Sequence, residues 1–167
     1  MSAEAIPALE TQLDRQQFRR VLGRFATGIT IPTVLGPHNQ PHGLTANSFT
    51  SVSMSPPLIS VCVDHRAKIL EYFRAGGHFG VNVLHASQRE LSDRFAGSGF
   101  DRFEGIAWTP GRTGVPLLPD ALAHLECRVF QTVTAGDHDI LIGQVIHAAF
   151  QDGEPLVFFA SQYRTLR

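Results

Sequence analysis

Residues 42–63 read HGLTANSFTSVSMSPPLISVCV, and this stretch indicates both the fold and a site. It packs Thr, Ser and Asn into two strand-like runs, then turns through Ser55-Pro56-Pro57 into an almost wholly apolar third. A strand inside a core favours Val or Ile at such positions. Small hydroxyl and amide side chains instead let a flat ligand lie against the sheet and hydrogen-bond to its backbone. This conflict with strand preference predicts a binding site.

Strand patterns continue on both sides of this stretch. The expected strands are 29–35, 43–46, 49–53, 58–63, 78–84, 123–134, 139–150 and 156–160. Pro32, inside the first, predicts a sheet edge or a bulge. The run 139–150 is apolar on both faces, which is typical of a barrel wall buried on both sides.

Helical spacing is confined to three short segments. Asp14 is the expected N-cap of the first, which carries Phe18, Val21, Leu22 and Phe25 at helical spacing and ends at Thr27-Gly28. The second helix places Ile69, Leu70 and Phe73 on one face and stops at Gly76-Gly77. The third has an expected capping box of Ser87 and Glu90 and closes at Gly97.

Many short strands and few helices predict a mainly β fold, a small β-barrel with helical additions. The 167 residues suit one domain. We expect residues 1–13 to form an N-terminal tail and residues 14–167 the domain. Phe95, Phe103 and Trp108 are expected in the core.

The composition excludes several classes of partner. Only 17 % of residues are charged, against roughly 25 % in ordinary soluble proteins, which suggests that a second copy of the chain covers part of the surface. A net charge of −1 gives no reason to expect nucleic acid or an acidic membrane. No apolar run approaches the roughly 20 residues of a membrane span. The N-terminus lacks signal-peptide features, so we expect a cytoplasmic location.

Motifs for other chemistries are missing from the sequence. Cys62 and Cys127 fit no metal or redox spacing and are expected to be buried thiols. No histidine–carboxylate cluster has metal-ligand spacing, so no metal site is expected. No GxGxxG joins a strand to a helix, which argues against a Rossmann domain. No Ser-His-Asp arrangement accompanies a nucleophile elbow.

An ordered set of motifs resembles the short-chain flavin reductases, which have the FMN-binding split-barrel fold. The motifs are FATGIT (25–30), GLTANSFTSVSMSPPLISVCVD (43–64), FGVNVL (79–84), RFAG (94–97), LECRV (125–129) and GDHDILIGQV (136–145). The resemblance implies a homodimer that uses NADH or NADPH to reduce FMN or FAD by hydride transfer. It also implies that the reduced flavin passes to a separate oxygenase.

The resemblance carries over to particular residues. Thr45, Ala46, Asn47 and Ser48 match the stretch that meets the flavin ring and ribityl chain.

The segment Asp64-His65-Arg66-Ala67-Lys68 leads into the second helix and is expected to cradle phosphate through Asp64, Arg66, Ala67 and Lys68. Ala67 and Ile69 depart from the pattern, because a hydroxyl residue is common at both positions. We therefore expect loose flavin binding or compensation by the neighbouring cations.

His138 matches the histidine beside flavin and nicotinamide, where it would position the nicotinamide or steady the charge of the reduced flavin. Tyr163 and Arg164 match a C-terminal pair that reaches the cofactor.

Two other functions stay open from the residues alone. One is a flavin-binding electron carrier or redox sensor on the same fold, without flavin-releasing turnover. The other is a barrel that binds another planar ligand, such as haem.

Overall fold

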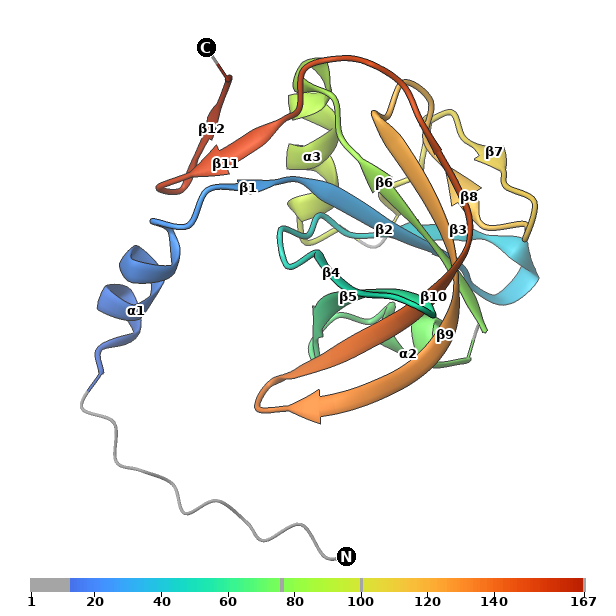
Figure 1. Cartoon of the computed structure of the whole chain (residues 1–167), viewed down its shortest axis with the longest axis horizontal. Helices are drawn as coiled ribbons and strands as arrows, with labels where there is room; N and C mark the ends of the chain where they lie inside the picture. The colour runs from blue at the N-terminus through green and yellow to red at the C-terminus, as the bar shows by residue number, and fades with distance from the viewer. Residues whose placement is uncertain (1–12, 76, 100, 167) are drawn as a thin grey trace, which may run out of the picture.

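A computed structural model describes residues 13–75, 77–99 and 101–166 of the chain (Figure 1). The helices are α1 (Arg15–Leu22), η1 (Pro37–Asn39), α2 (Leu70–Ala75), η2 (Ala86–Gln88) and α3 (Arg89–Ala96). The strands are β1 (Thr27–Gly28), β2 (Thr30–Leu35), β3 (Pro41–Gly43), β4 (Thr50–Met54), β5 (Pro57–Asp64), β6 (His78–Val83), β7 (Thr109–Pro110), β8 (Pro116–Leu117), β9 (Ala123–Ala135), β10 (His138–Phe150), β11 (Val157–Phe159) and β12 (Gln162–Arg164). The expected mainly β fold is confirmed.

A seven-stranded antiparallel sheet forms the body, in the order β3-β2-β6-β9-β10-β5-β4. The long β9–β10 hairpin runs through its centre, and the sheet curls around its own inner face (Figure 1). A bridge between Thr30 and Ala46 ties β2 to the segment after β3. On the other side of the sheet, β10 pairs with β5 in antiparallel register. This pairing places the first residue of β10, His138, opposite the last residue of β5, Asp64.

Two apolar clusters fill the interior. One lies within the curled sheet and includes Val61, Phe79 and Leu141, all fully buried. The other lies under α3 and contains the following buried residues: Ile29, Ile31, Leu84, Phe95, Phe103, Leu118 and Leu156. The core placement of Phe95 and Phe103 is confirmed, and Trp108 packs half-buried against the second cluster.

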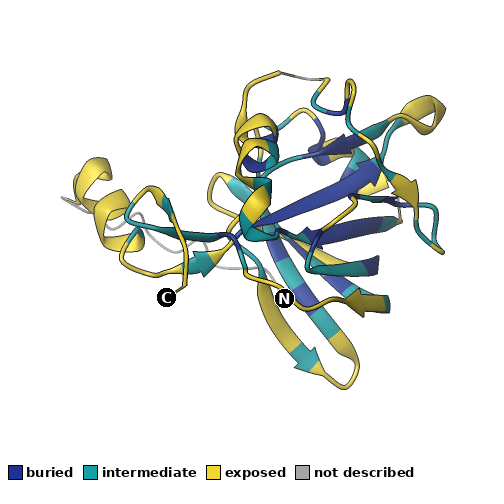
Figure 2. Cartoon of the chain, turned by 90° about the horizontal axis from the view of Figure 1, so that it is seen from above, coloured by how far each residue is buried: buried dark blue, intermediate teal, exposed yellow. Residues whose placement is uncertain are grey.

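A separate arm extends from the body. It consists of α1 and a small sheet in the order β1-β11-β12. Figure 2 shows the arm beside the sheet, with α1 exposed along its length. No residue of α1 is buried, although its expected apolar face is present.

Several local expectations are wrong. Residues 43–46 do not form a strand, because β3 ends at Gly43 and the backbone N–H of Thr45 donates to the α3 residue Phe95 instead of to a neighbouring strand. Thr27-Gly28 pairs with β11 as β1, so α1 ends earlier, at Leu22.

Helix starts were predicted with mixed success. The side chain of Asp14 accepts from the Gln17 N–H, which confirms the N-cap. The expected capping box of Ser87 and Glu90 is wrong. His85 caps η2 with its ring nitrogen, and Gln88 returns the bond to the His85 backbone N–H. Aromatic nitrogen is an unusual cap acceptor, and sequence rules favour hydroxyl and carboxylate caps.

Three other expectations, about the place of β2 in the sheet and the burial of β10 and of Cys62, are wrong. β2 is not the edge strand; Pro32 lies where its pairing with the edge strand β3 begins, and its carbonyl accepts from Leu44 N–H. β10 is buried on one face only, and Ile146 on the other face is exposed. Cys127 is buried as predicted, whereas Cys62 is half-exposed.

Candidate flavin site

A cavity of about 300 Å³ opens where the segment after β3, the end of β5, α3 and the start of β10 meet. Its lining residues are Leu44, Thr45, Ala46, Asn47, Ser48, Cys62, Val63, Asp64, Ala67, Phe95, Ala96, Arg102 and His138. The structure thus brings seven of the eleven predicted site residues to one cavity: Thr45, Ala46, Asn47, Ser48, Asp64, Ala67 and His138.

The segment 44–48 is held in place by its own polar groups. Thr45 Oγ1 donates to the carbonyl of Ser92 on α3 at 2.6 Å. Ser48 Oγ accepts from Cys62 N–H at 3.0 Å, which binds the segment to β5. These hydroxyls shape the wall and are already hydrogen-bonded within the chain.

Asn47 differs from its neighbours because its amide is uncommitted. It is exposed and lines the cavity, and its side chain has no hydrogen-bond partner among the described residues. An amide offers both donors and an acceptor to a heteroaromatic edge.

A glycine allows the tight contact between β3 and α3 at the cavity wall. A Cβ on Gly43 would meet the Phe95 ring at 2.9 Å, which is closer than side chains approach. Because Gly43 has no side chain, the Phe95 ring can both pack in the core and line the cavity.

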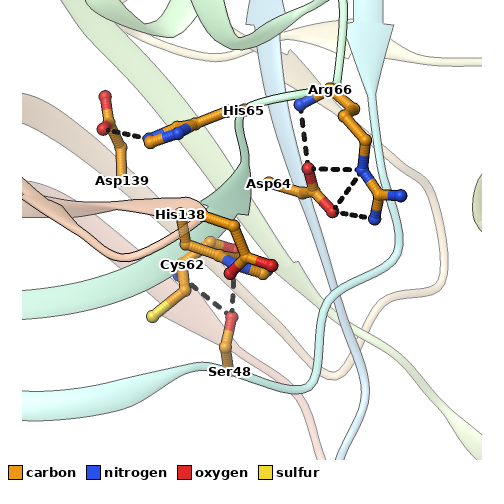
Figure 3. Close-up of polar contacts among 8 residues, drawn as sticks. Ser48, Cys62, Asp64, His65, Arg66, His138 and Asp139 are labelled. Atoms are coloured by element: carbon orange, nitrogen blue, oxygen red, sulfur yellow. Dashed lines mark hydrogen bonds and ion pairs between the residues drawn. The ribbon is translucent and has the colours of Figure 1, made fainter. Parts of the chain in front are cut away.

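Asp64 and Arg66 form a local ion pair at the rim (Figure 3). Arg66 Nη2 donates to Asp64 Oδ2 at 2.6 Å, and the Arg66 backbone N–H donates to Oδ1 at 2.8 Å. These bonds hold the pKa of Asp64 well below its usual range, and the bond from the Arg66 side chain has the larger effect. The charge of Arg66 is thus largely met by Asp64.

A second cavity of about 240 Å³ adjoins the first and shares Ala67 and Arg102 with it. Arg66 and Lys68 line it from one side and Ser98 and Gly99 from the other. α2 begins at Leu70, one residue after the start of the expected helical face, and residues 65–68 of the predicted phosphate segment lie in the loop that leads into it.

His138 enters the first cavity from the β9–β10 turn. Its Nδ1 shares a hydrogen bond of 2.7 Å with the carboxylate of Asp137, and this bond and the charge of His138 lower the pKa of Asp137. When the proton of this hydrogen bond is carried by Nδ1, the bond fixes the tautomer of the His138 ring. Nε2 then stays available to a ligand.

Behind His138, the buried carboxylate of Asp139 connects three elements. Asp139 Oδ1 lies 2.9 Å from His65 Nε2 (Figure 3) and accepts from Thr134 Oγ1 at 3.0 Å. Arg74 on α2 donates to Oδ2 through Nε and Nη2. The arrangement fixes the start of β10 against the loop that carries His65.

The C-terminal pair lies outside this cavity. The Tyr163 hydroxyl bonds to Ser92 Oγ at 2.9 Å and donates to Asp93 Oδ1 at 2.8 Å, behind α3. Arg164 donates to the neighbouring Gln162 side chain. Within one chain the structure therefore does not bring Tyr163 and Arg164 to the other predicted residues.

Sequence reasoning missed Arg102, Phe95 and Cys62 as lining residues. Arg102 lies in the Gly- and Pro-rich loop after α3, where no periodicity marks it. Phe95 and Cys62 sit in apolar patterns that equally indicate a core.

No group of three or more His, Cys, Asp or Glu side chains in residues 13–75, 77–99 and 101–166 is arranged to hold a metal ion. Over the same ranges, none of the helices has the length and apolarity required to cross a membrane.

Comparison with known proteins places the chain in a family. A family model described as "Flavin reductase like domain" matches residues 22–167. The chain belongs to the flavin reductase-like family. An NADH-dependent flavin reductase of Rhodococcus sp is 40 % identical, with 98 % of this chain and 93 % of that protein aligned.

Solved structures of flavin reductases share the fold. The NADH:FAD oxidoreductase of Streptomyces globisporus, solved in complex with NAD and FAD fragments, is 42 % identical with a TM-score of 0.87, and the match covers 92 % of this chain and 93 % of that one. The flavin reductase component of a bacterial two-component tryptophan halogenase is 41 % identical with a TM-score of 0.85, over 92 % and 98 % of the two chains. The expected split-barrel fold is confirmed.

Proposed function

We propose that this chain is an NADH:flavin oxidoreductase whose reduced flavin serves a separate oxygenase. The observation that carries the proposal is one cavity joining Asn47, the backbone of 45–48 and His138, in a chain 40 % identical to an NADH-dependent flavin reductase. Reductase subunits of flavin-dependent monooxygenases, such as one from Mycobacterium tuberculosis that is 35 % identical, support the oxygenase partner.

The cavity residues fit a flavin. When bound, a flavin supplies the redox chemistry, because its ring accepts a hydride from a reduced nicotinamide. The uncommitted amide of Asn47 offers hydrogen bonds to the polar edge of the ring, and Phe95, Val63 and Leu44 give it an apolar shelf. His138 holds the nicotinamide or stabilises the negative charge that develops on the ring. The remaining predicted ligands, Tyr163 and Arg164, stay predictions.

We further propose a homodimer. The apolar face of α1, formed by Phe18, Val21 and Leu22, is exposed in the single chain, and so is Phe25 just after the helix. An apolar face of this size on a projecting arm is typical of a subunit interface. NADPH as an alternative reductant and the cytoplasmic location stay predictions carried by the sequence.

The test is NADH oxidation by the purified protein, with and without added FMN or FAD. We expect turnover that depends on free flavin. His138→Ala should lower kcat/KM for NADH about ten- to a hundredfold, because one stabilising contact to the reacting groups is lost. His147→Ala, outside the cavity on the same strand, is the matched control and should leave the rate unchanged.

Two results would contradict the proposal. Tightly bound flavin that NADH does not reduce would favour the electron carrier or sensor. An unaltered rate in His138→Ala would remove the role assigned to that ring, even in an active reductase.

A further inference from the structure

Arg102 is a half-buried cation at the junction of the two cavities. It lines both the cavity that holds Asn47 and His138 and the adjoining one that holds Lys68. It comes from the loop after α3, on the opposite side from the predicted phosphate segment 64–68. A ligand that extended from one cavity into the other would lie beside this guanidinium.

The hydrogen bonds of Arg102 are made to neutral acceptors. Nη1 donates to the carbonyl of Gly43 at 2.8 Å, and Nε and Nη2 donate to the carbonyl of Gly97 at 3.1 and 2.6 Å. These three bonds use Nε, Nη1 and Nη2 once each. Since a guanidinium has five N–H groups, one N–H remains on each of Nη1 and Nη2. The bonds therefore hold the side chain rigidly and leave two donors at its end.

Among the residues that the structure describes, Arg102 has no ion-pair partner within 4.0 Å. Burial lowers the pKa of the guanidinium, which nevertheless stays protonated because arginine titrates far above neutral pH. Arg66 in the same cavity differs, since Asp64 meets its charge.

The adjoining cavity is lined by three cationic side chains, of which Arg66 already has a counter-charge in Asp64. Arg66, Lys68 and Arg102 line it, and none of its lining residues is acidic. A fixed cation with spare donors and no counter-charge is suited to an anion that takes two hydrogen bonds at once, as a phosphate does. Ala67 and Ile69, on the facing segment, bring no hydroxyl to such a group.

Resting on the flavin reductase proposed above, we propose that Arg102 binds the phosphate of the flavin and makes the site select phosphorylated flavins over riboflavin. The cation compensates for the hydroxyls absent at Ala67 and Ile69. It also joins the two walls, because Gly43 ends β3 and Gly97 follows α3. Arg102 is therefore expected to act on the affinity for the phosphate and not on the redox step.

The test compares FMN with riboflavin, which share the isoalloxazine ring and differ in the phosphate. Equilibrium binding is measured by quenching of flavin fluorescence, alongside NADH oxidation, for the wild type, Arg102→Lys and Arg102→Gln. In Arg102→Gln we expect FMN to bind about ten- to a hundredfold more weakly, the loss of one charge-assisted contact, and riboflavin to change less than about threefold. Arg102→Lys keeps the positive charge but lacks the paired N–H donors of the guanidinium. Its affinity for FMN should fall between those of the wild type and Arg102→Gln.

Arg112→Gln removes a surface arginine outside both cavities and serves as the matched control, with both affinities unchanged. Equal weakening of FMN and riboflavin in Arg102→Gln would show that Arg102 only holds Gly43 and Gly97, and would overturn the proposal. So would wild-type protein that binds riboflavin as tightly as FMN, a result that needs no variant to fold. Preference for FMN without NADH oxidation would support the phosphate site and refute the reductase.

Discussion

At the scale of single residues, Asp139 is the buried charge on which the site's geometry depends. Its side chain is 1 % exposed, and its partners come from the loop after β5, from α2 and from β9. The hydrogen bond from Arg74 is the largest influence and holds the pKa of Asp139 below its usual value. A carboxylate that is stabilised in the folded state stabilises the fold in turn.

The sign of the pH dependence follows from that lowered pKa. The contribution of Asp139 is complete above the unfolded-state pKa of about 3.9 and is lost as pH falls through the lower folded-state value. Asp139→Asn should therefore lower the melting temperature by several degrees at pH 7, because Arg74 loses its buried partner. The difference from wild type should shrink at pH values below 4.

Thermal unfolding from pH 3 to pH 8 measures this effect, with exposed Asp152→Asn as the control. A difference in melting temperature that stays constant over the whole range would rule out the ionised carboxylate as its source.

At the scale of elements, the C-terminal hairpin is connected to the cavity through α3. Tyr163 on β12 bonds to Ser92 Oγ, and the carbonyl of the same Ser92 accepts from Thr45 in the cavity wall. Phe158 and Arg89 pack on the Tyr163 ring. Tyr163 thus lies outside the cavity and acts on the position of Thr45 through α3.

Tyr163→Phe keeps the ring and removes both hydroxyl bonds. We expect a loss of about 1 kcal/mol in the free energy of unfolding and a few-fold rise in the KM for flavin at unchanged kcat, because the wall moves and the reacting groups do not. Tyr72→Phe is the matched control, since the Tyr72 ring stacks on His42 away from this wall. A fall in kcat at unchanged KM would instead place Tyr163 beside the reacting groups.

Element types were predictable where a local pattern set them. The alternation in β6, the apolar run of β5 and the β9–β10 hairpin each follow from residues adjacent in the chain. The strand predicted over residues 43–46 was wrong because the N–H of Thr45 donates to the backbone of Phe95, some fifty positions away, and interrupts the pairing with β2. Local preference cannot report a contact made by the backbone of a distant helix.

The part of the candidate site that an unusual local composition marks was predictable from the sequence. The part that depends on distant contacts was not. The stretch 45–48 departs from strand composition, and this departure is visible in the sequence itself. Arg102 became recognisable only in three dimensions, because its importance comes from missing counter-charges among the described residues and from its bond to the carbonyl of Gly43, 59 positions away. Neither leaves a mark in the residues next to it.

At the scale of the whole molecule, the arm is a part that one chain leaves uncovered. Its strands β1, β11 and β12 form their own small sheet, and α1 lies against neither apolar cluster. The low share of charged residues in the chain, 17 %, agrees with a surface that is partly covered in the assembly. The homodimer proposed above, with α1 packed on the partner, would explain both features.

Val21→Asp places a charge on this apolar face at a position that is 61 % exposed in the single chain. The fold of the single chain should therefore tolerate it, while burial of the unpaired carboxylate in an interface costs several kcal/mol. Light scattering coupled to size exclusion should show a dimer for the wild type and a species near 18.3 kDa for Val21→Asp. Gln16→Asp, on the polar face of the same helix, should stay dimeric. An unchanged mass in Val21→Asp, or a monomeric wild type, would mean that α1 is not the interface and that its apolar residues cover something else.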